Sequence, residues 1–352
     1  MWKATCALML LAAAPAAAQE YTVIAVSHAE NLISEIDPTT GQTLRKFTVM
    51  PGEWAGETHE GCVSSDGKTA YVSIPYAKHV VIFDLETFKP RGKIESEYFS
   101  RLSPHTQTTS RGGTRESTST DPHGVALNRD NTKLYITVEF GEVPGVVVYD
   151  VNTGKTKKID TVVAGNWLGV HPATGKIYMP NRNASDTMVV IDPKTDRVTR
   201  VVPLKEGSRP SGVDFGGPNG EVWVNGDGDG SVTVIDSTTD KVIKVIQPRM
   251  KGSGRIAVSP DGRFAAATQN KEVSIIDTRT KEIVAAMQFS PEGAASGHGY
   301  AVFSPDSGTL HVMDESSGDM ATFNMRDLKA PPKRSARIGA NSFGGGIRVL
   351  KK

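Results

Sequence analysis

Residues 230–246 read Gly-Ser-Val-Thr-Val-Ile-Asp-Ser-Thr-Thr-Asp-Lys-Val-Ile-Lys-Val-Ile. A short apolar run ends at Asp236, a polar turn follows, and a second run alternates lysine with apolar residues. Such alternation is typical of a strand with one solvated face, as at the outer edge of a sheet. Asp and Thr in the turn can bond to their own backbone. The stretch therefore predicts a strand, a tight corner and an edge strand.

The aspartate corner recurs along the whole chain, and its last copy carries asparagine. The seven instances are Asp37, Asp84, Asp150, Asp192, Asp236, Asp277 and Asn324. Successive corners are separated by 47, 66, 42, 44, 41 and 47 residues. A period in the forties that is built from short strands indicates a β-propeller with one four-stranded blade per repeat. We therefore predict an all-β fold.

Each repeat also holds a first strand, which ends in a Ser/Pro-Asp-Gly turn, and a second strand before the corner. Six complete blades are predicted at residues 59–95, 123–163, 167–204, 211–247, 254–290 and 298–338. The N-terminal segment Tyr21–Val49 lacks a first strand, and Gly344–Leu350 is a lone apolar strand. We predict a seven-bladed β-propeller with four antiparallel strands per blade. The N- and C-terminal strands would close the ring within one blade and remove its exposed sheet edges.

Two stretches carry a family resemblance. The string Asp-Gly-Lys-Thr-Ala-Tyr-Val (66–72) and residues 230–246 resemble the YVTN-type β-propeller repeats of exported bacterial proteins. The resemblance extends over essentially the whole mature chain. It implies a place in a broad group of surface-layer modules, lactonase-type enzymes, haem d1 domains of nitrite reductases, and periplasmic metal-handling or quinoprotein-accessory proteins. It does not imply one function, because a propeller is a platform for unrelated chemistries.

The first 18 residues have the pattern of a targeting segment. Lys3 gives a positive start, Ala4–Ala14 is an apolar run too short to anchor in a bilayer, and Ala16–Ala18 is a small-residue cleavage site. We expect a signal peptide over residues 1–18, cleavage after Ala18, and export to the periplasm or the exterior. Residues 19–352 would form a single propeller domain without a membrane span.

Charge and cysteine content limit the partners. Removing Lys3 from the 40 basic residues leaves their number equal to that of the 39 acidic ones, so the mature chain is formally neutral. Without a basic stripe, nucleic acid and anionic lipid are not expected partners. The mature chain keeps only Cys62, in an apolar strand, which predicts no internal disulfide and a buried, inert thiol. We expect a monomer.

The repeat is broken at two connections. The larger break, Ser96–Pro122, is an insert loop rich in Ser, Thr, Arg and Gly, and is interpreted as a lid, a docking segment or a plain surface loop. The smaller break, Met50–Thr58, carries Trp54. Its ring would either pack locally against the protein or stack on a ligand. Further candidates for the rim of a ligand site are Trp167, Arg182, Arg209 and Arg255. The arginines could clamp a carboxylate or phosphate, or pair with acidic neighbours.

Three histidines precede first strands. His59 and His123 each lie seven residues before the aspartate of the next turn, and His298 lies eight before its own. First strands line the channel of a propeller, so we expect these side chains at the channel mouth, where they could bind one divalent ion. Zinc, copper and calcium are not distinguished. Glu60 and Asp121 would support them. The alternative is channel histidines without a ligand, because one residue of register reverses a side chain's direction.

Absent motifs narrow the chemistry. The chain has no Gly-x-Ser-x-Gly elbow, no phosphate-binding glycine loop and no Cys-x-x-Cys-His, so covalent haem is not expected. The leading hypothesis is an exported propeller that binds a metal ion or small polar ligand at its channel mouth, with a periplasmic binding, chaperone or accessory role. One alternative is a metal-assisted lactonase or lyase. Another is a ligand-free scaffold that docks an exported protein through residues 96–122.

Overall fold

The structure of this chain is a computed structural model. The structure describes residues 20–49, 58–75, 77–99, 105–108, 114–117, 122–139, 144–161, 163–182, 185–252, 254–295, 297–339 and 342–350. The expected signal peptide lies outside these residues, as do Trp54 and Asp121.

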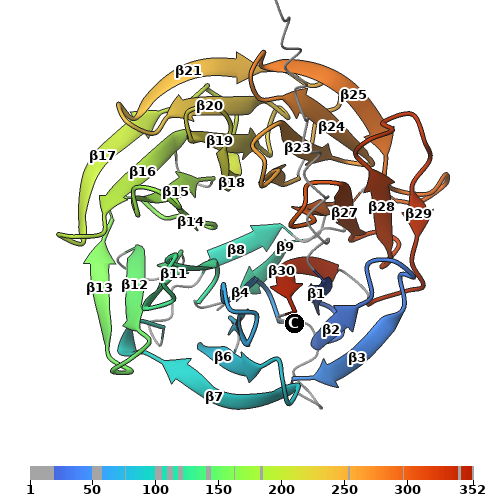
Figure 1. The fold of residues 1–352 in the computed structure, drawn as a ribbon. Coiled ribbons are helices and arrows are strands. Elements are labelled where there is room, and N and C mark those ends of the chain that lie inside the picture. Colours follow the sequence, from blue (N-terminus) through green and yellow to red (C-terminus); the bar gives the residue numbers. More distant parts are fainter. Residues whose placement is uncertain are drawn as a thin grey trace, which may run out of the picture.

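Seven four-stranded antiparallel sheets stand around a central axis, as Figure 1 shows. Six of them use four consecutive strands, ordered from the axis outward. They are β4–β7 (Gly61–Val63, Thr69–Ile74, His79–Asp84, Lys89–Glu95), β10–β13 (Val125–Leu127, Lys133–Val138, Gly145–Asp150, Thr156–Asp160), β14–β17 (Gly169–Val170, Ile177–Asn181, Thr187–Asp192, Arg197–Pro203), β18–β21 (Pro210–Gly216, Glu221–Gly226, Val232–Asp236, Lys241–Ile246), β22–β25 (Ile256–Val258, Phe264–Gln269, Glu272–Asp277, Glu282–Gln288) and β26–β29 (Gly299–Phe303, Thr309–Asp314, Met320–Asn324, Lys333–Arg334). The predicted seven-bladed propeller is confirmed.

The seventh sheet joins the two ends of the described chain. Its order is β3-β2-β1-β30, with β1 at Tyr21–Ser27, β2 at Leu32–Ile36, β3 at Thr43–Thr48 and β30 at Ser342–Val349. The C-terminal strand β30 takes the innermost place and pairs antiparallel with β1. The predicted closure by strands from both ends is therefore confirmed.

The aspartate corners have a common physical cause. At each corner the side-chain oxygen accepts backbone N–H groups two or three residues further on, which satisfies donors that the turn would otherwise leave unpaired. At Asp236, for example, Oδ1 accepts the N–H of Thr238 at 2.9 Å and that of Thr239 at 2.7 Å. Both bonds occur at Asp37, Asp84, Asp150 and Asp277, and the bond to the residue two positions later also occurs at Asp192 and Asn324.

The core lies between neighbouring blades. Second strands are buried almost throughout, as β5 and β19 are along their whole length. Fourth strands are mainly exposed: in β21 only Ile246 is buried, and Ile243 is 50% exposed. Apolar faces of adjacent sheets pack on each other, with Trp223, Tyr135 and similar large residues fully buried between them. This packing fixes where the inner ends of the blades meet at the axis.

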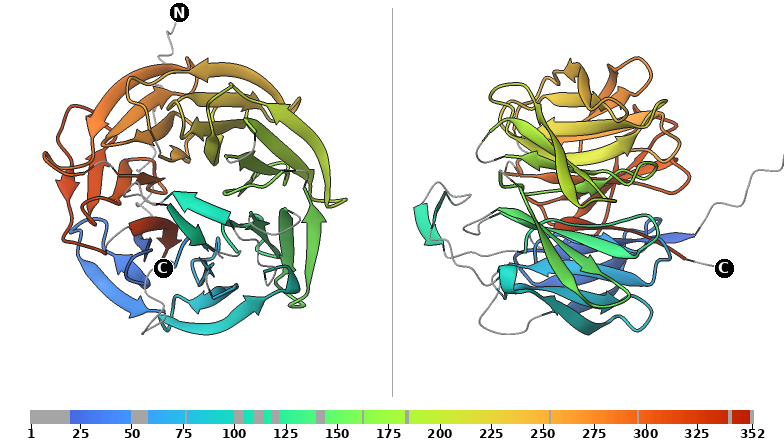
Figure 2. Two further views of the ribbon diagram at one scale, coloured as in Figure 1. Left: turned by 180° about the vertical axis from the view of Figure 1, so that it is seen from behind. Right: turned by 90° about the vertical axis from the view of Figure 1, so that its left-hand side faces the viewer.

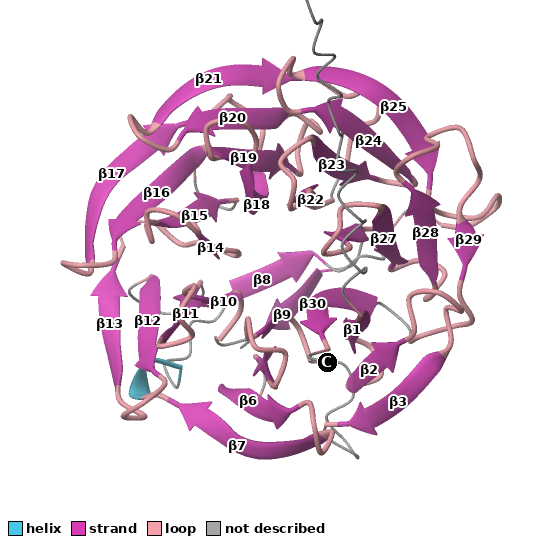
Figure 3. Ribbon diagram, in the orientation of Figure 1, coloured by secondary structure: helices cyan, strands magenta, loops and turns pink. Residues whose placement is uncertain are grey.

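The insert after β7 contains structure of its own. Its described parts are a short 3-10 turn at Glu97–Phe99 and a hairpin of β8 (His105–Thr108) with β9 (Thr114–Ser117), whereas the sequence predicted only a loop. The side view in Figure 2 shows this hairpin standing off one face of the ring, and Figure 3 shows that the described chain is otherwise strand and loop. No helix among the described residues has the length and apolar character needed to cross a bilayer.

Candidate functional site

The first strands surround a cavity of about 280 Å³ on the axis. Every blade contributes to its wall, including Trp167, Arg255 and Tyr300. One end of this channel opens on the face where first strands begin and second strands end. The insert connects a fourth strand to a first strand, so the β8–β9 hairpin projects from this same face.

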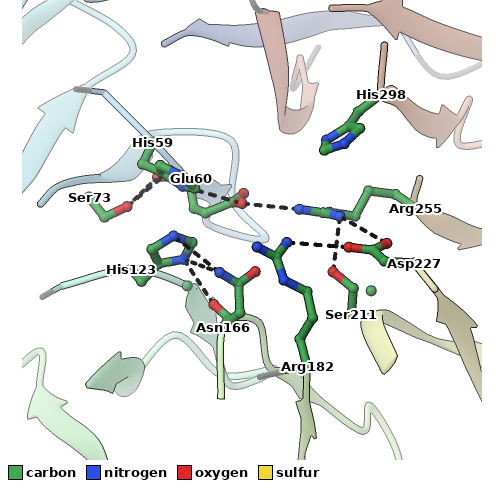
Figure 4. Close-up of polar contacts among 12 residues, drawn as sticks. His59, Glu60, Ser73, His123, Asn166, Arg182, Ser211, Asp227, Arg255 and His298 are labelled. Carbon is green, nitrogen blue, oxygen red and sulfur yellow. Dashed lines mark hydrogen bonds and ion pairs between the residues drawn. The ribbon is translucent and has the colours of Figure 1, made fainter. Parts of the chain in front are cut away.

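A repeated hydrogen bond fixes how the chain enters four first strands. A side-chain oxygen near the end of the second strand accepts the backbone N–H of a residue 13 positions earlier. The pairs are Ser73 with Glu60, Thr137 with Gly124, Asn225 with Gly212, and Thr268 with Arg255. Glu60 and Arg255 therefore occupy equivalent places in different blades, and both side chains are directed to the channel mouth (Figure 4).

Two of the expected histidines meet at this mouth. The rings of His59 and His123 have centroids 3.8 Å apart. Ligand atoms of His59, Glu60 and His123 all lie within 4.8 Å of one another, which is close enough to share one metal ion. His59 and His123 come from neighbouring blades, so the cluster is a product of the ring and not of a local motif.

The carboxylate of Glu60 is the most unusual group in the cluster. Glu60 is 1% exposed, and neither of its oxygens has a hydrogen-bond partner. One of its oxygens lies 3.5 Å from His59 Nδ1 and 3.8 Å from Arg255 Nη2. Burial raises the pKa of Glu60 to about 8, although Arg255 and Arg182 oppose this shift. A buried carboxyl without hydrogen bonds is costly, so it marks a place where a further group would be stabilised.

His123 is held by groups behind its ring. Its Nδ1 lies 3.0 Å from the backbone oxygen of Asn166, and its Nε2 lies 3.8 Å from Oε2 of Glu139. The Asn166 side chain in turn donates to Glu139 at 3.0 Å. A carbonyl that accepts from Nδ1 leaves Nε2 as an electron-pair donor. The amide nitrogen of Asn166 lies 3.2 Å from Nε2, so this amide would turn aside for Nε2 to bind a metal ion.

Arg255 occupies the centre of the mouth. Its guanidinium lies over the rings of Trp167 and Tyr300, 4.8 and 4.9 Å from their centroids. It donates to Ser211 Oγ at 3.1 Å and lies between Glu60 and Asp227, at 3.8 and 4.0 Å. Burial alone would lower the pKa of Arg255, but Tyr300 and the surrounding carboxylates raise it. Arg255 therefore keeps its positive charge in this buried position, between the acidic residues Glu60 and Asp227.

The other two rim arginines differ from Arg255. Arg182 forms an ion pair with Asp227 at 3.3 Å, and its Nε is buried without a hydrogen-bond partner. Arg209 is exposed, and its backbone N–H donates to Asp186 at 2.7 Å. The structure thus brings Arg182 and Arg255 to the mouth beside the histidines and leaves the Arg209 side chain on the surface.

His298 does not join the pair formed by His59 and His123. It lies beside Arg255 in Figure 4, with Nδ1 at 3.5 Å from Glu315. The strand register gives the reason. Aligned on their second-strand partners, the residue equivalent to His59 and His123 is Gly299, and His298 precedes it by one. The spacing of eight instead of seven residues before the turn was the sequence signal of this shift.

Sequence reasoning did not assemble a second ring of side chains, and it interpreted His28 as a solvated loop residue. These residues follow directly after the second strand of their blades and therefore occupy equivalent places at the mouth. They are His28, Glu139, Arg182, Asp227 and Glu315. Aligning the repeats on the ends of their second strands would have collected all five in one column, whereas the sequence analysis selected only Arg182 from it.

The histidines at the mouth favour their neutral form. Burial lowers the pKa of His59 well below its usual value, and His123, His28 and the two arginines add to the effect. Burial also lowers the pKa of His123 and of His298, against the opposing charges of Glu139 and Glu315. Neutral imidazole is the form that binds metal ions.

Comparisons with known proteins identify the fold alone. No family model matches the chain, and no curated protein matches it significantly. Among solved structures, a protein of unknown function from Desulfotomaculum acetoxidans is similar with a TM-score of 0.68 at 15% identity, covering 94% of this chain and 99% of its own. The hydrazine synthase of Kuenenia stuttgartiensis gives 0.64 at 18% identity, over 76% and 77%. Dihydro-haem d1 dehydrogenase NirN in complex with DHE gives 0.59 at 13% identity, over 93% and 74%.

Proposed function

We propose that this chain is an exported, single-domain propeller protein of the YVTN-repeat type that binds one divalent metal ion at its channel mouth. Residues 1–18 would be the signal peptide, and the mature protein would act in the periplasm or outside the cell as a monomeric binding or accessory protein. His59 and His123 supply nitrogen ligands, and Glu60 supplies oxygen. His298 and the rim residues Trp167, Arg182 and Arg255 surround the ion without binding it directly.

The Glu60 carboxyl carries this proposal. It is buried without a hydrogen bond, next to two histidines that favour the neutral form. A cation supplies what this site lacks, because it would both pair with the carboxylate and accept electron pairs from the imidazoles.

The charge balance of the mouth points the same way. Among the described residues at the mouth, the four carboxyl groups of Glu60, Glu139, Asp227 and Glu315 outnumber the two guanidiniums of Arg182 and Arg255. A divalent cation would neutralise this excess. A ligand is not carried over from the similar structures, because at 13–18% identity the likeness extends to the fold alone.

Metal-assisted hydrolysis or elimination at the same site is the second candidate. Its support is that further carboxyl groups, Glu139 and Glu315 among them, stand at the mouth beside the proposed ion without binding it. The ion would polarise a carbonyl, and a nearby histidine or carboxylate that does not bind the ion would move the proton. Turnover of a panel of lactones by the metal-loaded protein tests this candidate, and loss of that turnover in a variant that keeps its metal would support it.

Elemental analysis of protein purified from periplasm without an affinity tag tests the binding function. We expect about one equivalent of metal in the parent and none in the double variant His59→Ala/His123→Ala. The matched control is His79→Ala, since His79 bonds to the Ala77 backbone and stands outside the cluster. A parent that carries no metal and takes up neither zinc, copper nor calcium would contradict the proposal and favour the ligand-free scaffold.

A further inference from the structure

A third histidine lies next to the pair, and it comes from the blade that closes the ring. His28 directly follows β1. Its ring stands edge-on to that of His59, with the centroids 5.1 Å apart and the planes at 83°. His28, His59 and His123 thus form a row of imidazoles from three consecutive blades.

The turn that carries His28 is fixed to the segment that carries His59. Thr58 Oγ1 donates to the backbone oxygen of Ser27 at 2.6 Å, and the Thr58 N–H donates to Asn31 Oδ1 at 3.1 Å. Both Thr58 and Asn31 are buried. Two hydrogen bonds therefore join Thr58, which precedes His59, to Ser27 and Asn31 on either side of His28, so the backbone positions of the two histidines are fixed relative to each other.

The spacing of these rings suits a shared ion. With metal–nitrogen bonds of about 2.0–2.1 Å and tetrahedral angles, two imidazoles on one zinc ion have centroids about 5 Å apart. The His28 and His59 rings already have this spacing, at 5.1 Å. The His28 nitrogens are not among the ligand atoms that lie within 4.8 Å of one another, so the His28 ring would turn toward the ion on binding. The His59 and His123 rings, at 3.8 Å, would part by about 1 Å, which rotation of the partly exposed His59 ring allows.

We propose that His28 is the third nitrogen ligand of the mouth, so that three imidazoles and the Glu60 carboxylate form a site for zinc or copper(II) and not for calcium. This inference rests on the proposed metal-binding function and specifies its ion. Imidazole nitrogen suits zinc and copper, whereas calcium takes six to eight oxygen ligands, and this cluster offers at most two from Glu60.

The position of His28 also links the ion to ring closure. β1 pairs with the C-terminal strand β30, so an ion bound by His28 and His123 connects the closing blade to the two blades that follow it. A ligand that binds only the closed ring stabilises it by mass action. Zinc is therefore expected to slow amide hydrogen exchange in β1 and in its partner β30.

Competition titrations of zinc against a chromophoric chelator test the inference in the full mature protein. The variants are His28→Ala, His298→Ala and His79→Ala, each compared with the parent. We expect His28→Ala to weaken zinc binding at least tenfold, and the other two to change it less than threefold. X-ray absorption should count three imidazoles in the parent and two in His28→Ala, which a merely structural role would not produce.

The outcomes separate the two proposals. A parent that binds neither zinc, copper nor calcium would overturn the metal-binding function itself. A parent that binds zinc equally well with and without His28, or that loses binding in His298→Ala, would overturn the assignment of His28 alone. Tighter binding of calcium than of zinc would overturn the choice of ion. Thermal unfolding of each metal-free variant, expected within about 2 °C of the parent, shows that a loss of binding is not a loss of fold.

Discussion

The two faces of this propeller are built on opposite principles. On the face away from the mouth, the corners repeat one solution seven times: a side-chain oxygen at the end of the third strand bonds to the N–H groups of its own turn. At the mouth, equivalent positions differ from blade to blade, with Glu60, Trp167, Arg255 and Tyr300 at one level. The repeated face satisfies its polar groups locally, whereas the mouth leaves the Glu60 carboxyl without a hydrogen bond. The repeated residues therefore stabilise the fold, and the residues that differ between blades lie at the mouth, where a ligand can be bound.

The largest expected effect is at the centre of the mouth. Arg255→Met removes the buried charge that faces Asp227, and it also leaves Glu60, which keeps its proton at pH 7, without its cationic neighbour. Breaking a buried ion pair by removing one partner costs about 3–5 kcal/mol, so we expect a loss of stability of this size in urea unfolding at pH 7. The control is Arg182→Met, where the side chain is 27% exposed and the expected loss is about 1 kcal/mol. Equal losses of stability in the two variants would contradict a special structural role of Arg255 at the mouth.

The second effect distinguishes binding from stability at one residue. The pKa of Glu60, raised to about 8 from 4.5, means that the metal-free folded state holds a proton that the unfolded chain has released. The stabilisation that this proton provides is complete below about pH 4.5 and is lost as the pH rises through about 8. Glu60→Gln, which cannot ionise, should therefore be more stable than the parent at pH 9, on the order of a few kcal/mol, and equal to it near pH 4.5.

The same Glu60→Gln variant should bind zinc at least tenfold more weakly, because the amide replaces an anionic ligand. Urea unfolding at both pH values and zinc titration measure the two effects, with exposed Glu86→Gln as the control. A variant that is less stable at pH 9, or that retains the parent's affinity for zinc, would mean that Glu60 serves the fold instead of the site.

The smallest effect is expected on the repeated face. Asp236→Ala removes the oxygen that accepts the N–H groups of Thr238 and Thr239, on a half-buried turn. The expected cost is about 1 kcal/mol of stability, with no change in zinc affinity, as thermal unfolding and titration would show. Asp236→Asn, which keeps an acceptor oxygen, should recover most of the loss. A change in zinc affinity in Asp236→Ala would show that the repeated face also affects metal binding, and would contradict the distinction between the two faces.

The sequence was sufficient for the architecture because propeller blades are specified locally. The side-chain oxygen of Asp236 bonds to residues two and three positions later, and the neighbouring strands β20 and β21 pair across that turn. Because every repeat forms this local contact with the same kind of residue, the period can be counted in the sequence. The same reasoning predicted the closing blade, because Tyr21–Val49 lacked the strand that Gly344–Leu350 could supply.

The site was predictable only in part. His59, Glu60 and His123 were expected at the mouth from their places before first strands, and the structure brings them together. His298 was expected with them, but a shift of one residue puts Gly299 in the equivalent place. His28 lies beside His59 although the two are 31 residues apart and belong to different blades. Local hydrogen bonds and strand periodicity can be predicted from the sequence, because they involve residues that are close together in the chain. Which side chains meet at the axis depends on strand register and on ring closure, and only the tertiary structure decides both.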